Sequence, residues 1–186
     1  MLFLEEIWSR NFTNLFIAPL KLKEIITALI ITALIRTLIG LVPAIILTSP
    51  LFGVSILKLG LPLLLLFLSL YTFGITLGLL VSAGLIRYGP SFENIAWSSL
   101  FLLAPLGCIY YPIEILPNFF QLIAKGLPLV YIFDETRNIL LNGFVNYENL
   151  KQAYLLNIFY LIFGIGLFCL SFKRARVKGT LINMGE

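Results

Sequence analysis

The sequence contains no histidine, and only 12% of its residues are charged. The absence of histidine removes the side chain that enzymes use most often as a general base. No cysteine-rich zinc spacing and no GxxxxGK[ST] phosphate loop occurs in the sequence. No carboxylate pair is visible, because Glu93 and Glu114 lie at opposite ends of one apolar stretch. We therefore expect no catalytic residues, no metal ligands and no cofactor bound by this chain.

Cysteine is also scarce, and the basic residues do not form one soluble face. Cys108 and Cys169 both fall within long apolar stretches, where cysteine usually serves as a small apolar residue rather than in a disulfide or metal site. The net charge of +4 is spread over the ends of apolar stretches. Nucleic acid is therefore not an expected partner, since its binding needs a basic soluble surface.

Hydrophobic residues dominate what is present. They make up 60% of the 186 residues, and the mean hydropathy is +1.01, so the polar surface is too small to cover a soluble core. Residues 59–86, 94–113 and 152–172 carry no charge, and a helix needs about 20 residues to cross a bilayer. These runs lack the alternation of barrel strands. The sequence predicts an all-α, polytopic membrane protein forming one domain, with transmembrane helices at 25–47, 61–86, 95–113 and 153–172.

The basic residues predict how these four helices are oriented. Four crossings place both chain ends on one side of the membrane. Basic residues cluster on that side, before the first helix, between the second and third, and after the last: Arg10, Lys21, Lys23, Arg87, Lys173, Arg174, Arg176 and Lys178. By the positive-inside rule, both termini and the basic tail at 173–186 are expected in the cytoplasm, and the protein is expected in the cell membrane.

The segment at 5–24 has an amphipathic pattern. Ile7, Trp8, Phe12, Leu15 and Phe16 recur at helical spacing, and Pro19 ends the pattern. On physical grounds alone, this segment is an interfacial anchor that could belong to a membrane protein of any function.

Arg36 is the one charged residue within 25–47, and two accounts of it compete. It could face the interior of the bundle and meet a carboxylate or backbone carbonyls along a substrate pathway. Alternatively, the membrane helix could run from Thr37 to Leu57, which would leave Arg36 at the cytoplasmic interface. Pro50 argues mildly against the second account.

Small residues recur every four positions in the second apolar run, at Gly74, Gly78 and Ser82. Such a stripe lets another helix approach closely. Packing within the chain and a seam between two chains are both open, and the first is the more common use.

The stretch at 114–145 is too interrupted to cross a membrane. Residues 116–124 and 129–141 each suit a short helix, but Pro117, Gly126 and Pro128 break them apart. Two short helices meeting near Gly126 would dip into the outer leaflet and return. The alternative is an ordinary loop lying on the membrane surface.

The order of these features resembles the last third of ABC-2 type transporter permeases. The residues that carry the resemblance follow the third apolar run: Tyr111-Pro112-Ile113-Glu114-Ile115-Leu116-Pro117, Leu127-Pro128-Leu129, Asp134-Glu135-Thr136-Arg137 and Asn142-Gly143. Pro19 to Glu24, directly before a membrane helix, is similar to the family's cytoplasmic coupling segment. The resemblance covers nearly the whole chain, but the family's first two helices have no counterpart before Pro19.

The resemblance implies a permease subunit that exports an amphiphile, such as a drug, a lipid or a lipid-linked glycan. A separate soluble ABC ATPase would bind ATP and Mg²⁺, and a second permease subunit would complete a homodimer or heterodimer. The implied coupling residues are Pro19, Leu20, Lys21, Lys23 and Glu24. The implied lid over the outer mouth contains Pro112, Glu114, Pro117, Gly126, Pro128, Glu135 and Arg137. The alternatives are a membrane scaffold without transport and an intramembrane enzyme, and the second would need a polar cluster at one depth.

Overall fold

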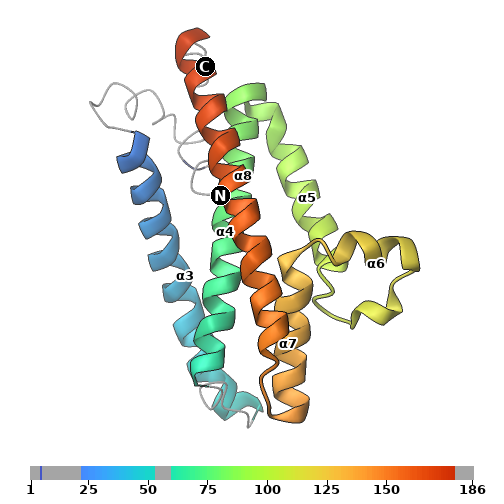
Figure 1. Ribbon diagram of the computed structural model, residues 1–186. Helices are drawn as coiled ribbons and strands as arrows, with labels where there is room; N and C mark the ends of the chain where they lie inside the picture. The colour runs from blue at the N-terminus through green and yellow to red at the C-terminus, as the bar shows by residue number, and fades with distance from the viewer. Residues whose placement is uncertain (1–4, 6–21, 53–59, 179–186) are drawn as a thin grey trace.

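The computed structural model of the protein describes residue 5, residues 22–52 and residues 60–178. Within these ranges the protein is helical and contains no strand, which confirms the predicted all-α class. Figure 1 shows long helices side by side and shorter ones to one side. The elements are α3 (Leu22–Phe52), α4 (Leu61–Tyr88), η2 (Pro90–Phe92), α5 (Glu93–Leu106), η3 (Ile113–Ile115), α6 (Asn118–Ala124), α7 (Pro128–Asn142) and α8 (Tyr147–Lys178).

Three of the described helices are long and apolar enough to cross a membrane. The qualifying stretches are Lys23–Thr48, Leu61–Tyr88 and Tyr147–Val177. They correspond to the predicted helices at 25–47, 61–86 and 153–172. The helices α3 and α8 extend beyond the predicted bounds at both ends, because polar residues next to an apolar run can continue a helix outside the apolar zone. Part of the predicted basic tail, up to Lys178, is therefore the end of α8.

The central pair of the bundle is α4 and α8, which lie side by side and run parallel along most of their length (Figure 1). Leu79, Leu85 and Phe168 form part of its apolar core. Gly164 permits the close approach, since a Cβ added there would lie 3.4 Å from the Thr76 side chain and 3.5 Å from its backbone oxygen. Small residues at a helix crossing have this effect in membrane proteins generally.

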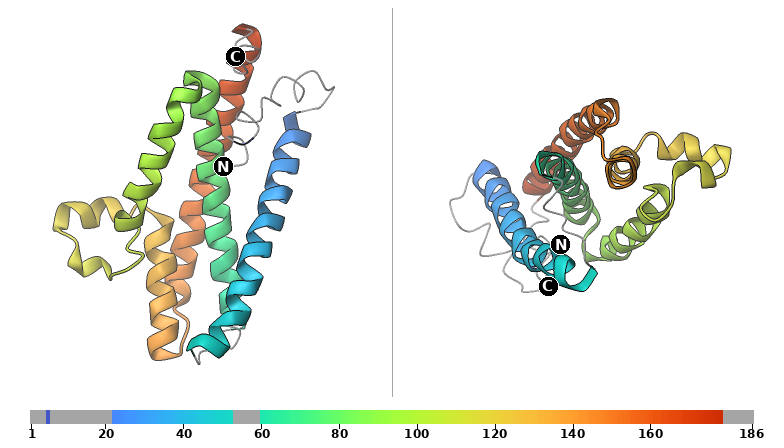
Figure 2. Two further views of the ribbon diagram at one scale, coloured as in Figure 1. Left: turned by 180° about the vertical axis from the view of Figure 1, so that it is seen from behind. Right: turned by 90° about the horizontal axis from the view of Figure 1, so that it is seen from below.

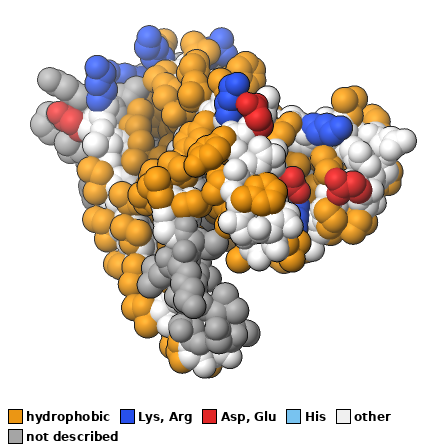
Figure 3. Space-filling view, turned by 60° about the horizontal axis from the view of Figure 1, so that its bottom comes forward, with side chains coloured by type: hydrophobic (Ala, Val, Ile, Leu, Met, Phe, Trp, Pro, Cys, Tyr) orange, Lys and Arg blue, Asp and Glu red, His pale blue; other side chains and the backbone are white. Residues whose placement is uncertain are grey.

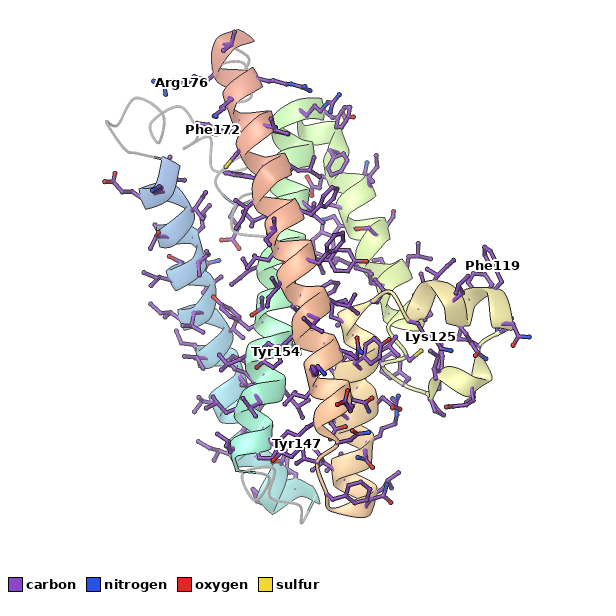
Figure 4. All side chains as sticks on the ribbon, viewed as in Figure 1. Phe119, Lys125, Tyr147, Tyr154, Phe172 and Arg176 are labelled. Carbon is purple, nitrogen blue, oxygen red and sulfur yellow. The ribbon has the colours of Figure 1, made fainter. Side chains whose placement is uncertain are left out.

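Three hydrogen bonds from two side chains in the first half of α8 also join this pair. Asn157 is fully buried, and its Nδ2 donates to the Ser69 backbone oxygen at 2.9 Å and to Ser69 Oγ at 2.8 Å. The Tyr154 hydroxyl donates to the Leu65 oxygen at 2.8 Å, and Figure 4 labels this side chain between α8 and α4. Between helices in an apolar medium, such bonds contribute about 0.6 to 2 kcal/mol each.

The predicted membrane helix at 95–113 is wrong in its extent. Its counterpart α5 has 14 residues and ends at Leu106, so it is about 21 Å long, too short to cross a bilayer as one helix. Pro105 lacks an N–H, and Gly107 and Cys108 turn the chain away. Cys108 has a φ of 52°, a left-handed conformation that is uncommon for a residue with a side chain.

The helices α5 and α7 follow one another along the length of the bundle. Figures 1 and 2 show α5 running from the end where α4 stops to about mid-height, and α7 continuing to the opposite end beside α8. Residues 107–127, which include α6, project sideways between them. At the far end, Gly143 adopts a φ of 74° and its N–H caps α7 by donating to the Ile139 oxygen at 3.0 Å. The start of α3 and the end of α8 consequently lie at the same end of the bundle.

The helix α3 is the least enclosed of the long helices. Only 6% of the most apolar stretch of α3 is buried, against 28% of the corresponding stretch of α4. The Tyr71 hydroxyl of α4 reaches across and donates to the Ile30 oxygen at 2.6 Å. The outer face of α3 is apolar and exposed. The exposed residues are Ile31, Ile35, Leu38, Ile39, Val42, Ile46, Leu47 and Leu51.

Charge is distributed unevenly along the bundle. In Figure 3, Lys and Arg side chains form a row along the upper edge, while hydrophobic side chains cover much of the surface below it. The ends of α3, α4 and α8 that meet at this side carry Lys23, Arg87, Lys173, Arg174 and Arg176. Figure 4 labels Arg176 at this end and Tyr147 near the other.

The contact at Gly164 generates a test of the α4–α8 pair. We expect Gly164→Leu to lower the free energy of unfolding by about 1–3 kcal/mol, because the added atoms would meet the α4 backbone. Gly166→Leu is the matched control, since nothing lies within 4 Å of a Cβ at that position. Melting in detergent, followed by tryptophan fluorescence, compares the two. Equal melting temperatures would show that α4 and α8 do not pack closely at Gly164.

Candidate functional site

A cavity of about 440 Å³ lies between α3, α4 and α8. We call it the α3–α4 cavity. Its walls are mainly apolar and include Leu29, Ile30, Leu79 and Phe168. Cavities of this size, with apolar walls and few polar groups, are typical of sites for small molecules. The polar groups here are therefore the informative ones.

The charged groups of the cavity are Arg36 and Glu5. Arg36 Nη1 donates to Glu5 Oε2, and the two side chains form an ion pair. Arg36 lies within α3, which is a continuous helix from Leu22 to Phe52. The alternative membrane helix from Thr37 to Leu57 stays a prediction, since its last residues lie outside the described ranges. Arg36 meets a carboxylate, as the first account expected. The two side chains are 56% and 44% exposed, so this pair is accessible rather than sealed in the core.

The small-residue stripe borders the same cavity. Gly74 and Gly78 line it, and a Cβ added at either position would have no atom within 4 Å. Ser82 is buried and its hydroxyl donates to the Gly78 oxygen at 2.7 Å. Within the described residues, the two glycines therefore widen a cavity instead of packing against a helix. The glycine at the close helix crossing is Gly164, on α8.

A second group of predicted residues secures the break between α5 and α7. The Tyr111 hydroxyl donates to the Pro105 oxygen at 2.8 Å, at the last turn of α5. Arg137 Nη1 donates to the Cys108 oxygen at 2.8 Å, and its Nη2 lies 3.5 Å from Asp134 Oδ1. Arg137 thus joins α7 to the turn that follows α5, and Asp134 lies beside it on α7. A charged donor satisfies the carbonyl that the turn leaves free.

Glu135, in the same motif, is fully buried and joins α7 to α8. Its Oε1 accepts the Asn146 N–H at 2.7 Å, and its Oε2 accepts from Asn149 Nδ2 at 3.3 Å. The Asn149 amide also lies 3.4 Å from Asp134 Oδ2. The Glu135 carboxylate therefore stabilises the turn between α7 and α8.

The remaining residues predicted for the lid mark the ends of short elements. Pro112 precedes η3, which contains Glu114; Pro117 precedes α6, and Pro128 begins α7. The carbonyl of Gly126 accepts the Tyr160 hydroxyl at 3.0 Å, which fastens this linker to α8. The predicted pair of short helices is present, broken where expected, although α7 runs along α8 rather than lying apart from the bundle.

The small cluster beneath this linker contains a buried thiol. Cys108, Ala124 and Val130 are buried together, with Tyr111 and Leu127 packed around them. The thiol serves packing among these side chains. Cys108 and Cys169 are both free.

Of the predicted coupling residues, Lys23 and Glu24 lie in the first turn of α3. Pro19, Leu20 and Lys21 lie outside the described residues, as does nearly all of the amphipathic segment. Among the residues that the structure describes, no group of His, Cys, Asp and Glu side chains could hold a metal ion.

Sequence reasoning missed two residues in these regions. Glu5 was not expected to meet Arg36, because the two are 31 positions apart and nothing in the sequence pairs them. Asn157 was overlooked as well. A polar residue within an uncharged run of 21 residues was a usable signal, since such residues usually bond to a neighbouring helix.

Comparison with known proteins assigns this chain to no family. No family model matches it, and neither does any curated protein or solved structure. The geometry of the described residues and the sequence pattern are therefore the grounds for a functional proposal.

The buried carboxylate at the α7–α8 turn can be tested directly. We expect Glu135→Ala to destabilise the turn by about 1–3 kcal/mol, because the Asn146 N–H loses its acceptor. Glu135→Gln is the matched control, since its amide oxygen can still accept that bond. Hydrogen exchange at residues 143–149 should accelerate in the alanine variant and change less in the glutamine variant. Unchanged exchange in both variants would remove Glu135 from this role.

Proposed function

We propose that this chain is the membrane-spanning permease subunit of an ATP-driven exporter of amphiphiles. The observation that carries the proposal is the α3–α4 cavity, a partly open space between apolar helices that contains an ion pair. A charged side chain in a membrane helix costs free energy, so charged residues at such positions often mark functional sites. A scaffold without transport would have no use for such a space.

The broken passage made by α5 and α7 supports the same proposal. Discontinuous helices are a recurring feature of transporters, where the interrupted backbone lines a pathway or is buried in protein. Here the break lies beside α8 and is held by Arg137 and Tyr160. It coincides with the residues that resemble ABC-2 permeases, which is the second ground for proposing a transport subunit.

In this proposal, the basic end of the bundle faces the cytoplasm. A soluble ABC ATPase binds there, against the segment at 5–24, and uses ATP and Mg²⁺. Its movement reaches the membrane through α3, which begins at Leu22, within the end of this segment, and has few contacts with the rest of the bundle. A loosely held helix that borders the cavity is well placed to change the width of that cavity.

The projecting segment at 107–127 is proposed as the lid at the outer mouth, dipping into the outer leaflet. Its helix α6 exposes Phe119, Phe120, Leu122 and Ile123, and Figure 4 shows Phe119 pointing away from the bundle. These side chains favour acyl chains or a second permease subunit over water. Its backbone at that depth is satisfied by helical bonds and by contacts with α7 and α8.

Orientation is the first point to test. A reporter that is active only in the cytoplasm, fused after Gly143, should give no signal, because the α7–α8 turn lies at the end opposite the basic residues. The same reporter fused after Lys178 should be active. Strong activity after Gly143 would overturn the proposed orientation.

Coupling to an ATPase is the second point. The double variant Leu20→Asp with Lys23→Glu should insert normally but lose ATP-driven export, because the docking segment would repel its partner. The measurements are retention of a soluble ABC ATPase from the same cells on washed membranes, and ATP-dependent accumulation of a dansyl-labelled phospholipid in everted vesicles. Retention and export that remain unchanged in the variant would leave this segment as an anchor. Failure of the wild-type chain to retain that ATPase would favour a scaffold.

A further inference from the structure

The α3–α4 cavity has a polar end and an apolar end. Because α3 and α4 run in opposite directions (Figure 1), Arg36 lies toward the Tyr71 end, and Ile26 lies toward the Ser82 end. Leu79 and Phe168 make the second end apolar. A long ligand would therefore meet charge at one end of the cavity and hydrocarbon along the rest.

Among the described residues that line the polar end, Arg36 is the group left to bind a ligand's anion. The hydroxyls of Tyr71 and Thr37 at this end are engaged as donors to the backbone oxygens of Ile30 and Ala33 on α3. The Ser82 hydroxyl, at the other end, donates to the Gly78 oxygen of its own helix. Arg36 has five N–H donors, and its partner is the single carboxylate of Glu5. Glu5 lies at the cavity wall, so its carboxylate occupies the position that a ligand's acid would take.

The apolar part suits a slender chain. Gly74 and Gly78 remove two side chains from one wall, and the space beside each is open to at least 4 Å. A volume of about 440 Å³ is in the lower part of the range for small-molecule sites. One alkyl chain fits such a space better than a bulky polycyclic compound would.

We propose that the α3–α4 cavity binds a single-chain amphiphile with one anionic headgroup, and that this headgroup displaces the Glu5 carboxylate from Arg36. Glu5 then acts as an internal competitor: it neutralises Arg36 while the cavity is empty and leaves when an acid arrives. As the substrate site of an exporter, the cavity rests on the proposed function. As a binding site, it can be tested without any ATPase.

The test uses the full chain in neutral maltoside micelles, with dansyl-aminoundecanoic acid as the probe. Dansyl fluorescence reports binding, and the methyl ester of the probe is the uncharged control. The acid should bind about ten-fold more tightly than the ester, since a hydrogen bond between charged groups supplies that difference. Equal binding of acid and ester would overturn the proposal.

Substitutions at Arg36 and at Glu5 test the role of each charge in binding. Arg36→Gln should weaken binding of the acid about ten-fold and leave the ester unchanged, whereas Arg36→Lys should retain part of the preference. Glu5→Gln should strengthen binding of the acid by roughly three-fold, the effect expected for losing a half-exposed competing ion pair. Weaker or unchanged binding in Glu5→Gln would show that Glu5 does not compete. Melting temperatures confirm that each variant is folded.

A third substitution tests the apolar part. Gly78→Leu should abolish binding of both acid and ester, because the leucine side chain fills the space without a clash. Gly40→Leu and Gly166→Leu are matched controls in open space that do not line the cavity, and both should bind as the wild type does. If Gly78→Leu also binds normally, the ligand lies elsewhere and the proposal fails.

Unlabelled amphiphiles that compete with the dansyl probe identify which headgroup the cavity accepts. A transport measurement then distinguishes this binding site from the proposed export function. Dodecanoate displaces the probe if carboxylates are accepted, and lysophosphatidic acid displaces it if phosphates are accepted. If zwitterionic lysophosphatidylcholine displaces it equally well, selectivity for anions is refuted. Binding that prefers the acid without ATP-driven export would refute the exporter alone. Export without such binding would refute this site alone.

Discussion

The structure depends on one constraint: in apolar surroundings, each backbone carbonyl left free by a broken helix must find a donor within the protein. The break between α5 and α7 is where this demand is greatest. Tyr111 supplies a donor to Pro105, Arg137 supplies one to Cys108, and Tyr160 supplies one to Gly126. These bonds also fix where α7 lies, and hence where the α7–α8 turn and Glu135 lie. Residues from the most distinctive part of the sequence thus stabilise the interruption between α5 and α7.

A second consequence concerns the contrast between α8 and α3. The close crossing at Gly164 and the amide of Asn157 hold α8 against α4. The helix α3 has the Tyr71 bond to Ile30 and few other contacts, and two glycines on α4 face it across open space. Tight packing on one side of α4 and loose packing on the other create the cavity. Within it, the Arg36 and Glu5 charges stabilise each other while remaining accessible, which is the combination that a site for a charged amphiphile requires.

Much of the architecture could be predicted from composition. The three long helices follow from uncharged runs of sufficient length, and the break near Gly126 and Pro128 follows from residues that interrupt helices. The third predicted membrane helix failed because the uncharged run at 94–113 was treated as one helix. Pro105 and Gly107 were the local signal that α5 would end early. The stripe at Gly74 and Gly78 was predicted to pack against a helix, because spacing shows that two positions share a face but not what lies opposite.

The sequence by itself determined which segments are helical and which end of the bundle is basic, because helix breaks and charge are properties of neighbouring residues. Only the tertiary structure decided that α5 and α7 follow one another along the bundle, that Arg137 bonds to Cys108 and that Arg36 meets Glu5. The partners in those two contacts are 29 and 31 positions apart in the chain. They meet only because packed helices bring them together, and no local periodicity encodes such a distance. The α3–α4 cavity has the same origin, since it is the space that three helices leave between them.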